Sequence, residues 1–176
     1  MAHRLRTVHT ADLGPAERSA VRALLDEAFA GQCGDDDWDH ALGGVHALVE
    51  QDGRVLAHGS VVQRVLLHGG RALRCGYVEG VAVAPSARRQ GLAGQVLAAL
   101  EGVIARAYDL GALSATDEAV ALYEGRGWQP WRGPTAVLAP EGLLPTPGEA
   151  PHVLVGAAAL DLDGLLACDP REGDPW

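Results

Sequence analysis

Residues 77–101 read YVEGVAVAPSARRQGLAGQVLAALE, and the character of the chain changes twice within them. The apolar run Tyr77–Val83 ends just before Pro85, and a short basic, glycine-containing segment follows. From Leu92 to Tyr108 the apolar residues then recur at helical spacing. The pattern predicts a buried strand that passes through a tight turn into the N-terminus of a long helix.

This turn is suited to a phosphate group, because the first amides of a helix have no intrahelical acceptor and the helix dipole adds partial positive charge. The small residues Gly91, Ala93 and Gly94 would let a pyrophosphate approach the backbone, and Arg88 and Arg89 would add charge-assisted contacts. Neither the P-loop pattern nor a complete G-x-G-x-x-G is present. An ordinary glycine-containing helix start is the alternative interpretation.

Further strands and helices are predicted on both sides of this junction. Before it we expect a strand over Leu5–His9, a helix from Pro15, a short helix around Trp38–Leu42, and strands over Val45–Gln51, Arg54–His68 and Arg71–Val83, joined by the turns Asp52–Gly53 and Gly69–Gly70. After it we expect a strand at 112–115, a helix at 117–126, a strand at 128–138, a proline-rich loop at 140–151 and a last strand at 152–160. This order predicts an α/β (α+β) fold with a mixed, mainly antiparallel central sheet flanked by helices.

Length and composition narrow the class of protein. With 176 residues, 48% of them hydrophobic, the chain is expected to form a single domain over residues 1–176. Its formal charge of −9 argues against nucleic acid or an anionic membrane as partner and favours a cationic one, although solubility alone would also explain it. No signal peptide and no long apolar segment is seen, so a cytoplasmic protein is expected.

Metal and disulfide chemistry are not indicated. The cysteines Cys33, Cys75 and Cys168 are odd in number and lack C-x-x-C spacing. The seven histidines contain no H-E-x-x-H, and His40 and His46 have no partners at metal-binding spacing. We therefore expect free thiols and no metal.

Two motifs together resemble the GNAT superfamily of acetyl-CoA-dependent N-acetyltransferases: the strand V-E-G-V-A-V before Arg88-x-x-Gly91-x-Ala93, and Leu-Tyr-Glu-Gly-Arg-Gly-Trp in a later helix. In that family the strand splays from its neighbour at a bulge. The resemblance implies that coenzyme A contacts Val81, Ala82, Val83, Arg88, Arg89, Gln90, Gly91, Leu92, Ala93 and Gly94. It also implies that Tyr123 protonates the departing thiolate.

Longer segments are similar to the aminoglycoside 2′-N-acetyltransferases within that superfamily. They are LGGVHALV, ALRCGYVEGVAV, LYEGRGWQPWRGPTAVLAP and the final Asp-Pro-Trp. The resemblance implies acetyl transfer to the 2′-amino group of an aminoglycoside by a homodimer. It further implies a substrate site of Gln32, Asp37, Glu79, Gly80, Ser114, Glu149, Asp174 and Trp176, the last through its free carboxylate. Gln32 departs from the family, where a carboxylate is expected.

The residues can also be read against the chemistry of amine acetylation, which needs a neutral amine, a polarised thioester carbonyl and a proton for the leaving sulfur. Glu79 stands in an apolar run and could take the ammonium proton directly or through a water; a structurally satisfied carboxylate is the alternative. Tyr123 could act as general acid or simply pack in the core. Direct transfer in a ternary complex needs no acetylated Cys75.

Two other functions stay open at this point. One is acetylation of another cationic metabolic amine, because an acidic pocket predicts a polycation without naming it. The other is a non-catalytic module that binds coenzyme A or the drug. The joint presence of Glu79 and Tyr123 argues against the second alternative.

Overall fold

The computed structural model describes residues 3–155 and 160–176, and these form two compact units. Unit 1 contains the described residues up to Val62 together with Val78–Val103, and unit 2 contains Gln63–Tyr77 and Ile104–Trp176. Strands β3 (Arg54–His68) and β4 (Arg71–Val83) and helix α3 (Leu92–Ala107) each contribute residues to both units. The predicted bounds of β3 and β4 are confirmed.

Three antiparallel strands form the first part of unit 1. Strand β1 (Arg4–His9) pairs with β2 (Val45–Gln51), and β2 pairs with β3 through a hairpin. The hairpin turns at Asp52 and Gly53, which have φ angles of +51° and +78° as the predicted two-residue turn requires. The strands that the sequence predicts here are therefore confirmed, with β1 starting one residue earlier than expected.

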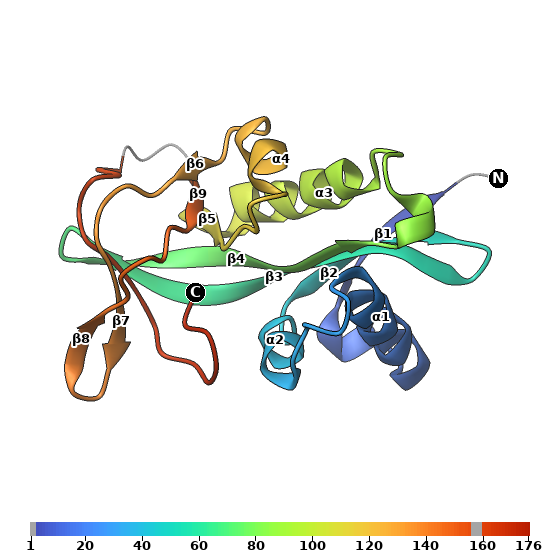
Figure 1. Ribbon diagram of the computed structural model, residues 1–176, viewed down its shortest axis with the longest axis horizontal. Coiled ribbons are helices and arrows are strands. Elements are labelled where there is room, and N and C mark those ends of the chain that lie inside the picture. The colour runs from blue at the N-terminus through green and yellow to red at the C-terminus, as the bar shows by residue number, and fades with distance from the viewer. Residues whose placement is uncertain (1–2, 156–159) are drawn as a thin grey trace. The chain divides into compact units, whose positions relative to one another are not determined.

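Helices cover both faces of these strands. Helix α1 (Pro15–Ala28) buries Val21, Leu24 and Leu25, as its apolar spacing predicts. In Figure 1, α1 and α2 (Asp35–His40) lie on one face, and the N-terminal part of α3 lies on the other. Helix α2 starts three residues before the predicted Trp38, because the Asp37 carboxylate caps the Gly34 backbone N–H at 2.7 Å. The 3₁₀ turns η1 (Thr10–Asp12) and η2 (Pro85–Ala87) complete the unit.

Helix α3 approaches the strands closely at Gly59. A methyl group added to Gly59 would lie 2.8 Å from Val96 Cγ1, 3.1 Å from Leu100 Cδ1 and 3.2 Å from Val81 Cγ2. Glycine at this position therefore lets α3 pack directly on β3.

Unit 2 contains a sheet with the strand order β6-β9-β5-β4-β3-β10-β7-β8. Its other elements are α4 (Val120–Glu124), β5 (Leu110–Leu113), β6 (Gln129–Pro130), β7 (Thr135–Ala139), β8 (Gly142–Pro145), β9 (His152–Val155) and β10 (Leu166–Cys168). The β4–β5 and β10–β7 pairs are parallel, whereas β10–β3, β5–β9, β6–β9 and β7–β8 are antiparallel. The predicted mixed, mainly antiparallel sheet flanked by helices is confirmed.

Several predicted bounds in unit 2 are wrong. The strand expected at 112–115 lies at Leu110–Leu113, and the helix expected at 117–126 is confined to Val120–Glu124. The single strand expected at 128–138 is divided into β6 and β7, because the backbone N–H groups of Arg132 and Gly133 both bond to the Leu162 carbonyl. Strand β8 lies within the expected loop.

The C-terminal strand expected at 152–160 is described as β9 up to Val155, and residues 156–159 of that prediction lie outside the described residues. Strand β10 was not predicted. It has only three residues, and it is defined by its pairing with β3 and β7 rather than by a local pattern.

Strands β4 and β5 pair over a short distance. Among the described residues, their parallel ladder runs from Cys75↔Leu110 to Tyr77↔Ala112, whereas β4 continues to Val83. Strand β5 itself ends at Leu113, so the ladder cannot continue along β4, and the expected splaying of the strand pair stays a prediction. In the described parts of the chain, no helix is long and apolar enough to cross a membrane.

Candidate active site

The predicted catalytic strand departs from extended backbone at Gly80 in unit 1, and this point is called the β4 bulge here. Gly80 has a φ of +57°. This left-handed conformation is unfavourable for a residue that has a side chain, whereas glycine adopts it readily. Its neighbours Glu79 and Val81 are both half-buried. The run continues with buried Ala82 and half-buried Val83, so the backbone predicted to meet the thioester lies directly after the bulge.

The predicted pyrophosphate turn precedes α3 in the same unit. Arg89 and Gly91 have φ angles of +64° and +76°, and the Gly91 carbonyl accepts the first helical bond, from the Gln95 N–H at 3.2 Å. Arg88, Arg89, Gln90 and Gly91 are exposed, Leu92 is buried, and Ala93 and Gly94 are half-buried.

The space around this turn suits an anion. A methyl group built on Gly91 would meet no atom within 4 Å, so the approach to the backbone is open. Arg88 donates one hydrogen bond, to the Ala28 carbonyl at 3.2 Å. The exposed guanidinium groups and the helix N-terminus together provide what a pyrophosphate requires.

Tyr123 lies in α4 of unit 2 and is 6% exposed. Burial raises the pKa of its phenol to about 12, so the hydroxyl keeps its proton at neutral pH. The ring of Trp128 packs edge-on against it, with the ring centroids 6.1 Å apart. The phenol of Tyr123 therefore keeps its proton and its ring packs in the core, and its role as general acid stays a prediction.

Three of the predicted substrate residues are brought together in unit 2. The Trp176 indole N–H donates to Thr146 Oγ1, and the Trp176 backbone N–H donates to Asp174 Oδ1, each at 2.9 Å. The Glu149 backbone N–H bonds the Thr146 carbonyl at 3.3 Å. Burial and then the charge of Asp174 raise the pKa of Glu149. Ser114 belongs to this unit too and is exposed directly after β5.

The other predicted acceptor residues belong to unit 1. Gln32 lies before α2 and Asp37 lies within it, and both residues are exposed. One oxygen of Asp37 already caps Gly34. Glu79 and Gly80 lie on β4 of the same unit.

Sequence reasoning missed a cluster that holds the C-terminal residues in unit 2. Arg64 is 4% exposed and bonds Asp169 Oδ1 at 2.8 Å and the Pro175 carbonyl at 2.8 Å. Arg171 donates to the Trp176 backbone oxygen at 2.8 Å, so the oxygen predicted to bind an ammonium group is already paired. Both guanidinium groups face the Tyr77 ring, at 4.9 Å and 5.4 Å. An arginine within the apolar strand VVQRVLL is the one sequence signal of this cluster.

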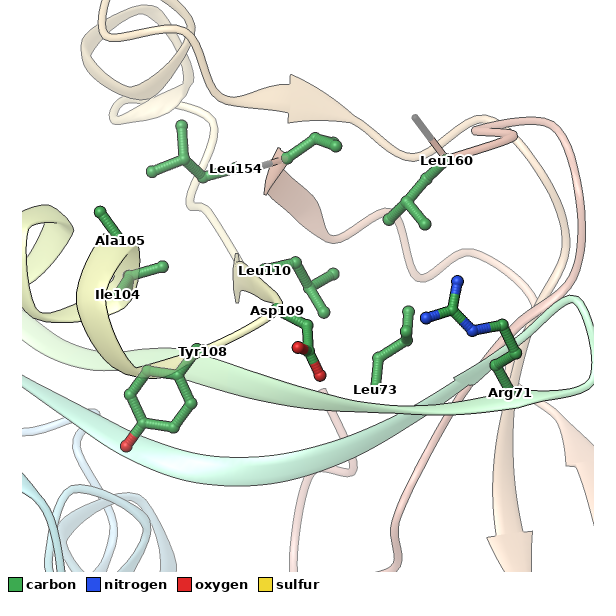
Figure 2. Close-up of a pocket in the computed structure, with 10 residues that line it drawn as sticks. Arg71, Leu73, Ile104, Ala105, Tyr108, Asp109, Leu110, Leu154 and Leu160 are labelled. Atoms are coloured by element: carbon green, nitrogen blue, oxygen red, sulfur yellow. The ribbon is translucent and has the colours of Figure 1, made fainter. Parts of the chain in front are cut away.

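A cavity of about 630 Å³ in unit 2 is not the predicted site. Figure 2 shows Leu73, Leu110, Leu154 and Leu160 around it, with Asp109 as its carboxylate. A backbone hydrogen bond from Arg74, assisted by the charge of that guanidinium, lowers the pKa of Asp109. A largely apolar cavity with its carboxylate already paired does not suit a polycation.

In the described ranges 3–155 and 160–176, no group of three or more His, Cys, Asp or Glu side chains could hold a metal ion. None of the three cysteines forms a disulfide, and Cys75 is fully buried.

Comparisons with known proteins agree with this fold. A family model described as an acetyltransferase (GNAT) domain matches residues 10–131. The chain is 48% identical, over 99% of its length and 92% of the relative, to an aminoglycoside 2′-N-acetyltransferase from Mycolicibacterium fortuitum.

Two solved structures show the same fold at low sequence identity. A GNAT family acetyltransferase from Brucella melitensis in complex with acetyl-CoA has a TM-score of 0.60 and 17% identity, over 94% of this chain and 96% of that one. Eis1 from Mycobacterium abscessus has a TM-score of 0.62 and 18% identity over 77% of this chain, which spans about a third (33%) of the Eis1 structure. This chain belongs to the GNAT family of acetyltransferases.

Proposed function

We propose that this protein is an aminoglycoside 2′-N-acetyltransferase that transfers the acetyl group of acetyl-CoA to the 2′-amino group of its substrate. The observation that carries the proposal is its 48% identity, over 99% of its length, to the Mycolicibacterium fortuitum protein of that name. Because one fold supports many functions, it is this similarity, and not the GNAT fold alone, that favours the substrate.

Acetyl-CoA would lie along β4 and the N-terminus of α3. The open approach to Gly91 and the exposed Arg88 and Arg89 support a pyrophosphate there. Gln90, Leu92, Ala93 and Gly94 would complete the turn, and the backbone of Val81, Ala82 and Val83 would bond the pantetheine arm. The proposed reaction needs no metal.

In the reaction, the amine nitrogen attacks the thioester carbonyl carbon, a C–N bond forms and the C–S bond breaks. Glu79 would accept the ammonium proton before attack, directly or through a water. A backbone N–H near Val81 would stabilise the charge that develops on the carbonyl oxygen. Tyr123 would protonate the departing thiolate, and its pKa of about 12 supports a phenol that still holds its proton at neutral pH. No acetyl group is bound to the enzyme.

The acceptor would be held by carboxylates and hydroxyls, since an aminoglycoside carries several ammonium groups. Burial and then the charge of Asp174 raise the pKa of Glu149, and a bound ammonium group would stabilise its charged form against both effects, which supports a cation site. Gln32, Asp37, Gly80 and Ser114 are further proposed contacts. Trp176 would contribute through its carboxylate, one oxygen of which bonds Arg171.

We expect one domain, because the GNAT match at 10–131 extends through parts of both units. A cytoplasmic location would give access to acetyl-CoA. A homodimer remains a prediction. Leu138, Leu143, Leu144 and Leu165 are exposed leucines of unit 2 that association would cover. Light scattering on the purified protein would measure its mass. We expect no nucleic acid or membrane partner for a chain of net charge −9.

The first experiment follows thiol release from acetyl-CoA with tobramycin and with kanamycin A, which bears a hydroxyl at the 2′ position. Release with tobramycin alone is expected. Release with both would place the acetylated amine elsewhere. Release with neither, while acetyl-CoA still binds, would favour another cationic amine or a non-catalytic binding module.

The same assay tests the two catalytic residues. Glu79→Gln removes the proton acceptor, and Tyr123→Phe removes the proton donor; each is expected to lower kcat by about 100-fold or more. Unchanged rates in a folded variant would remove that residue from the mechanism.

A further inference from the structure

Three buried side chains of unit 1 form a continuous line that ends at the β4 bulge. Thr10 Oγ1 lies 2.7 Å from His46 Nε2, His46 Nδ1 lies 2.9 Å from His58 Nε2, and His58 Nδ1 lies 2.8 Å from the Gly80 carbonyl oxygen. Thr10 is 8% exposed, and both histidines are 0% exposed. The line therefore joins η1 to the residue after Glu79, through β2 and β3.

Strand register brings the two histidines together, although they are twelve positions apart in the sequence. In the β2–β3 ladder His46 faces Ser60 and Leu48 faces His58, so the histidines are diagonal neighbours on one face. Gly59 contacts α3, so His58 lies on the opposite face, where Leu25 of α1 packs near Gly80. The sequence predicted no function for these histidines.

The bond to Gly80 determines which atom donates and which accepts in every other hydrogen bond of the line. The Gly80 carbonyl can only accept, so His58 Nδ1 carries a proton. In a neutral imidazole the other nitrogen is then an acceptor, so His58 Nε2 accepts from His46 Nδ1–H. By the same rule His46 Nε2 accepts from the Thr10 hydroxyl.

The surroundings of Thr10 agree with this direction. Its oxygen accepts the backbone N–H of Gly43 at 2.9 Å, and its backbone N–H already donates to the Gly44 carbonyl at 2.9 Å. The hydroxyl is 3.2 Å from that same carbonyl, farther than from His46 Nε2. The single hydroxyl proton is therefore available to His46.

A proton added to His58 would break the line, because its Nε2–H would face the Nδ1–H of His46. A proton added to His46 would instead point its Nε2–H at Thr10 Oγ1, so the Thr10 hydroxyl would have to turn away. Burial, with smaller contributions from the neighbouring His9 and Arg18, lowers the pKa of His46 to about 4. Burial and the neighbouring His46 lower the pKa of His58 to about 3, although its bond to Gly80 opposes the shift. Both rings therefore stay neutral where the enzyme would work, and a backbone carbonyl cannot pass a proton onward.

The line thus positions backbone rather than moving protons. Gly80 needs its left-handed φ of +57°, and a hydrogen bond to its carbonyl from a fixed ring opposes rotation of the two peptide units around it. Those peptide units join Gly80 to Glu79 and to Val81.

We infer that the Thr10–His46–His58 line sets the orientation of the β4 bulge through the bond from His58 to Gly80, so that His58 is a positioning residue for Glu79 and for the Val81 backbone N–H, and His46 fixes the tautomer of His58. The inference rests on the roles proposed above for Glu79 and Val81, and its tests are chosen to be separable from them.

The first test determines the tautomers of His46 and His58 in the protein without substrate, by long-range ¹H–¹⁵N NMR of the imidazole rings. Both histidines are expected as the Nδ1–H tautomer with Nε2 unprotonated, without change between about pH 5.5 and 8. An Nε2–H tautomer at His58, or titration of either ring in that window, would overturn the inference. This result does not depend on any enzymatic activity.

The second test compares His58→Asn with His58→Leu. The asparagine amide keeps a donor for the Gly80 carbonyl but leaves His46 without its acceptor, whereas leucine removes both contacts. We expect His58→Leu to lower kcat by about 10- to 100-fold with little change in the KM for acetyl-CoA, and His58→Asn to stay within about threefold of wild type. Both variants should unfold more easily than wild type.

A merely structural role predicts that kcat falls in step with stability in both variants, which would overturn the inference. His68→Leu is the matched control, because His68 Nδ1 also bonds a backbone carbonyl, that of Leu165 at 2.9 Å, but in unit 2. Its kcat is expected to be unchanged.

The amide resonances of Gly80 and Val81 give a readout that needs no turnover. They should shift in His58→Leu and remain near their wild-type positions in His58→Asn; equal shifts in both variants would contradict the inference. If wild-type protein acetylates no amine, the proposed function fails, and the tautomers and these amide shifts still decide whether the line orients the bulge.

Discussion

Gly59→Ala tests the packing that places α3 on the sheet of unit 1. The added methyl group would lie 2.8 Å from Val96 Cγ1 and within 3.1–3.2 Å of Leu100 and Val81. Because these neighbours must move, the overpacking costs about 1–3 kcal/mol. The reduced freedom of the unfolded chain offsets about 0.4–1 kcal/mol of that cost. A net loss of about 1–2 kcal/mol is expected, which corresponds to a Tm lower by roughly 3–6 °C.

A double-mutant cycle identifies the clash itself. Val96 is fully buried, so Val96→Ala alone should cost about 2 kcal/mol through two lost methyl groups. It also removes the closest atom to the new methyl group. In the Val96→Ala background, Gly59→Ala should therefore cost at least about 1 kcal/mol less than in wild type.

Urea and thermal unfolding of the four proteins measure the cycle. Gly14→Ala is the matched control, since its methyl group would lie 3.5 Å from the flexible end of Glu17 at an ordinary φ of −65°. The reasoning is refuted if Gly59→Ala is as stable as wild type, or if its cost is the same with and without the Val96 side chain.

Three further predictions concern the site and the buried histidines. Tyr123→Phe should keep the fold and KM while kcat falls by about 100-fold, and a fully active variant would contradict the role of Tyr123 as proton donor. Because the phenol has a pKa of about 12, its ionisation should cause no loss of wild-type rate below about pH 11. Cys75→Ala should keep kcat within about threefold of wild type, because the buried thiol takes no part in direct transfer; a folded but inactive variant would instead indicate a covalent acetyl-enzyme. The pKa values of His46 and His58 are about 4 and about 3, below the ordinary 6.5, so the stability that the two neutral rings confer is present above about pH 6.5 and is lost as the pH falls toward these values. Urea unfolding should therefore show about 4 kcal/mol less stability at pH 5 than at pH 8. A His58→Asn variant that loses the same stability in acid would contradict this origin.

Local patterns predicted much of the fold, because they report properties that a short segment carries by itself. The apolar spacing of Val21, Leu24 and Leu25 identified α1, and the pair Asp52–Gly53 identified the β2–β3 hairpin. The weak points were short elements. Strand β10 has three residues and exists because two other strands pair with it, which its own sequence does not reveal.

The features of the candidate site also divide into those carried by adjacent residues and those that depend on contacts between distant residues. The sequence by itself determined the strand–turn–helix at residues 77–101, the small residues at the start of α3 and the unusual acid Glu79, because each is a feature of adjacent residues. Glu149, Asp174 and Trp176 were expected only by resemblance. The bond from the Trp176 indole to Thr146, thirty residues earlier, brings the end of the chain to the segment that carries Glu149.

Only the tertiary structure decided what lies behind the site. His46 and His58 meet because the β2–β3 register places them on one face, and their line ends at Gly80 because β4 passes there with a left-handed bulge. Arg64 finds Asp169 more than a hundred residues later in the chain. Such contacts depend on register, burial and the direction of single hydrogen bonds, and these are properties of packed strands that no local pattern of residues encodes.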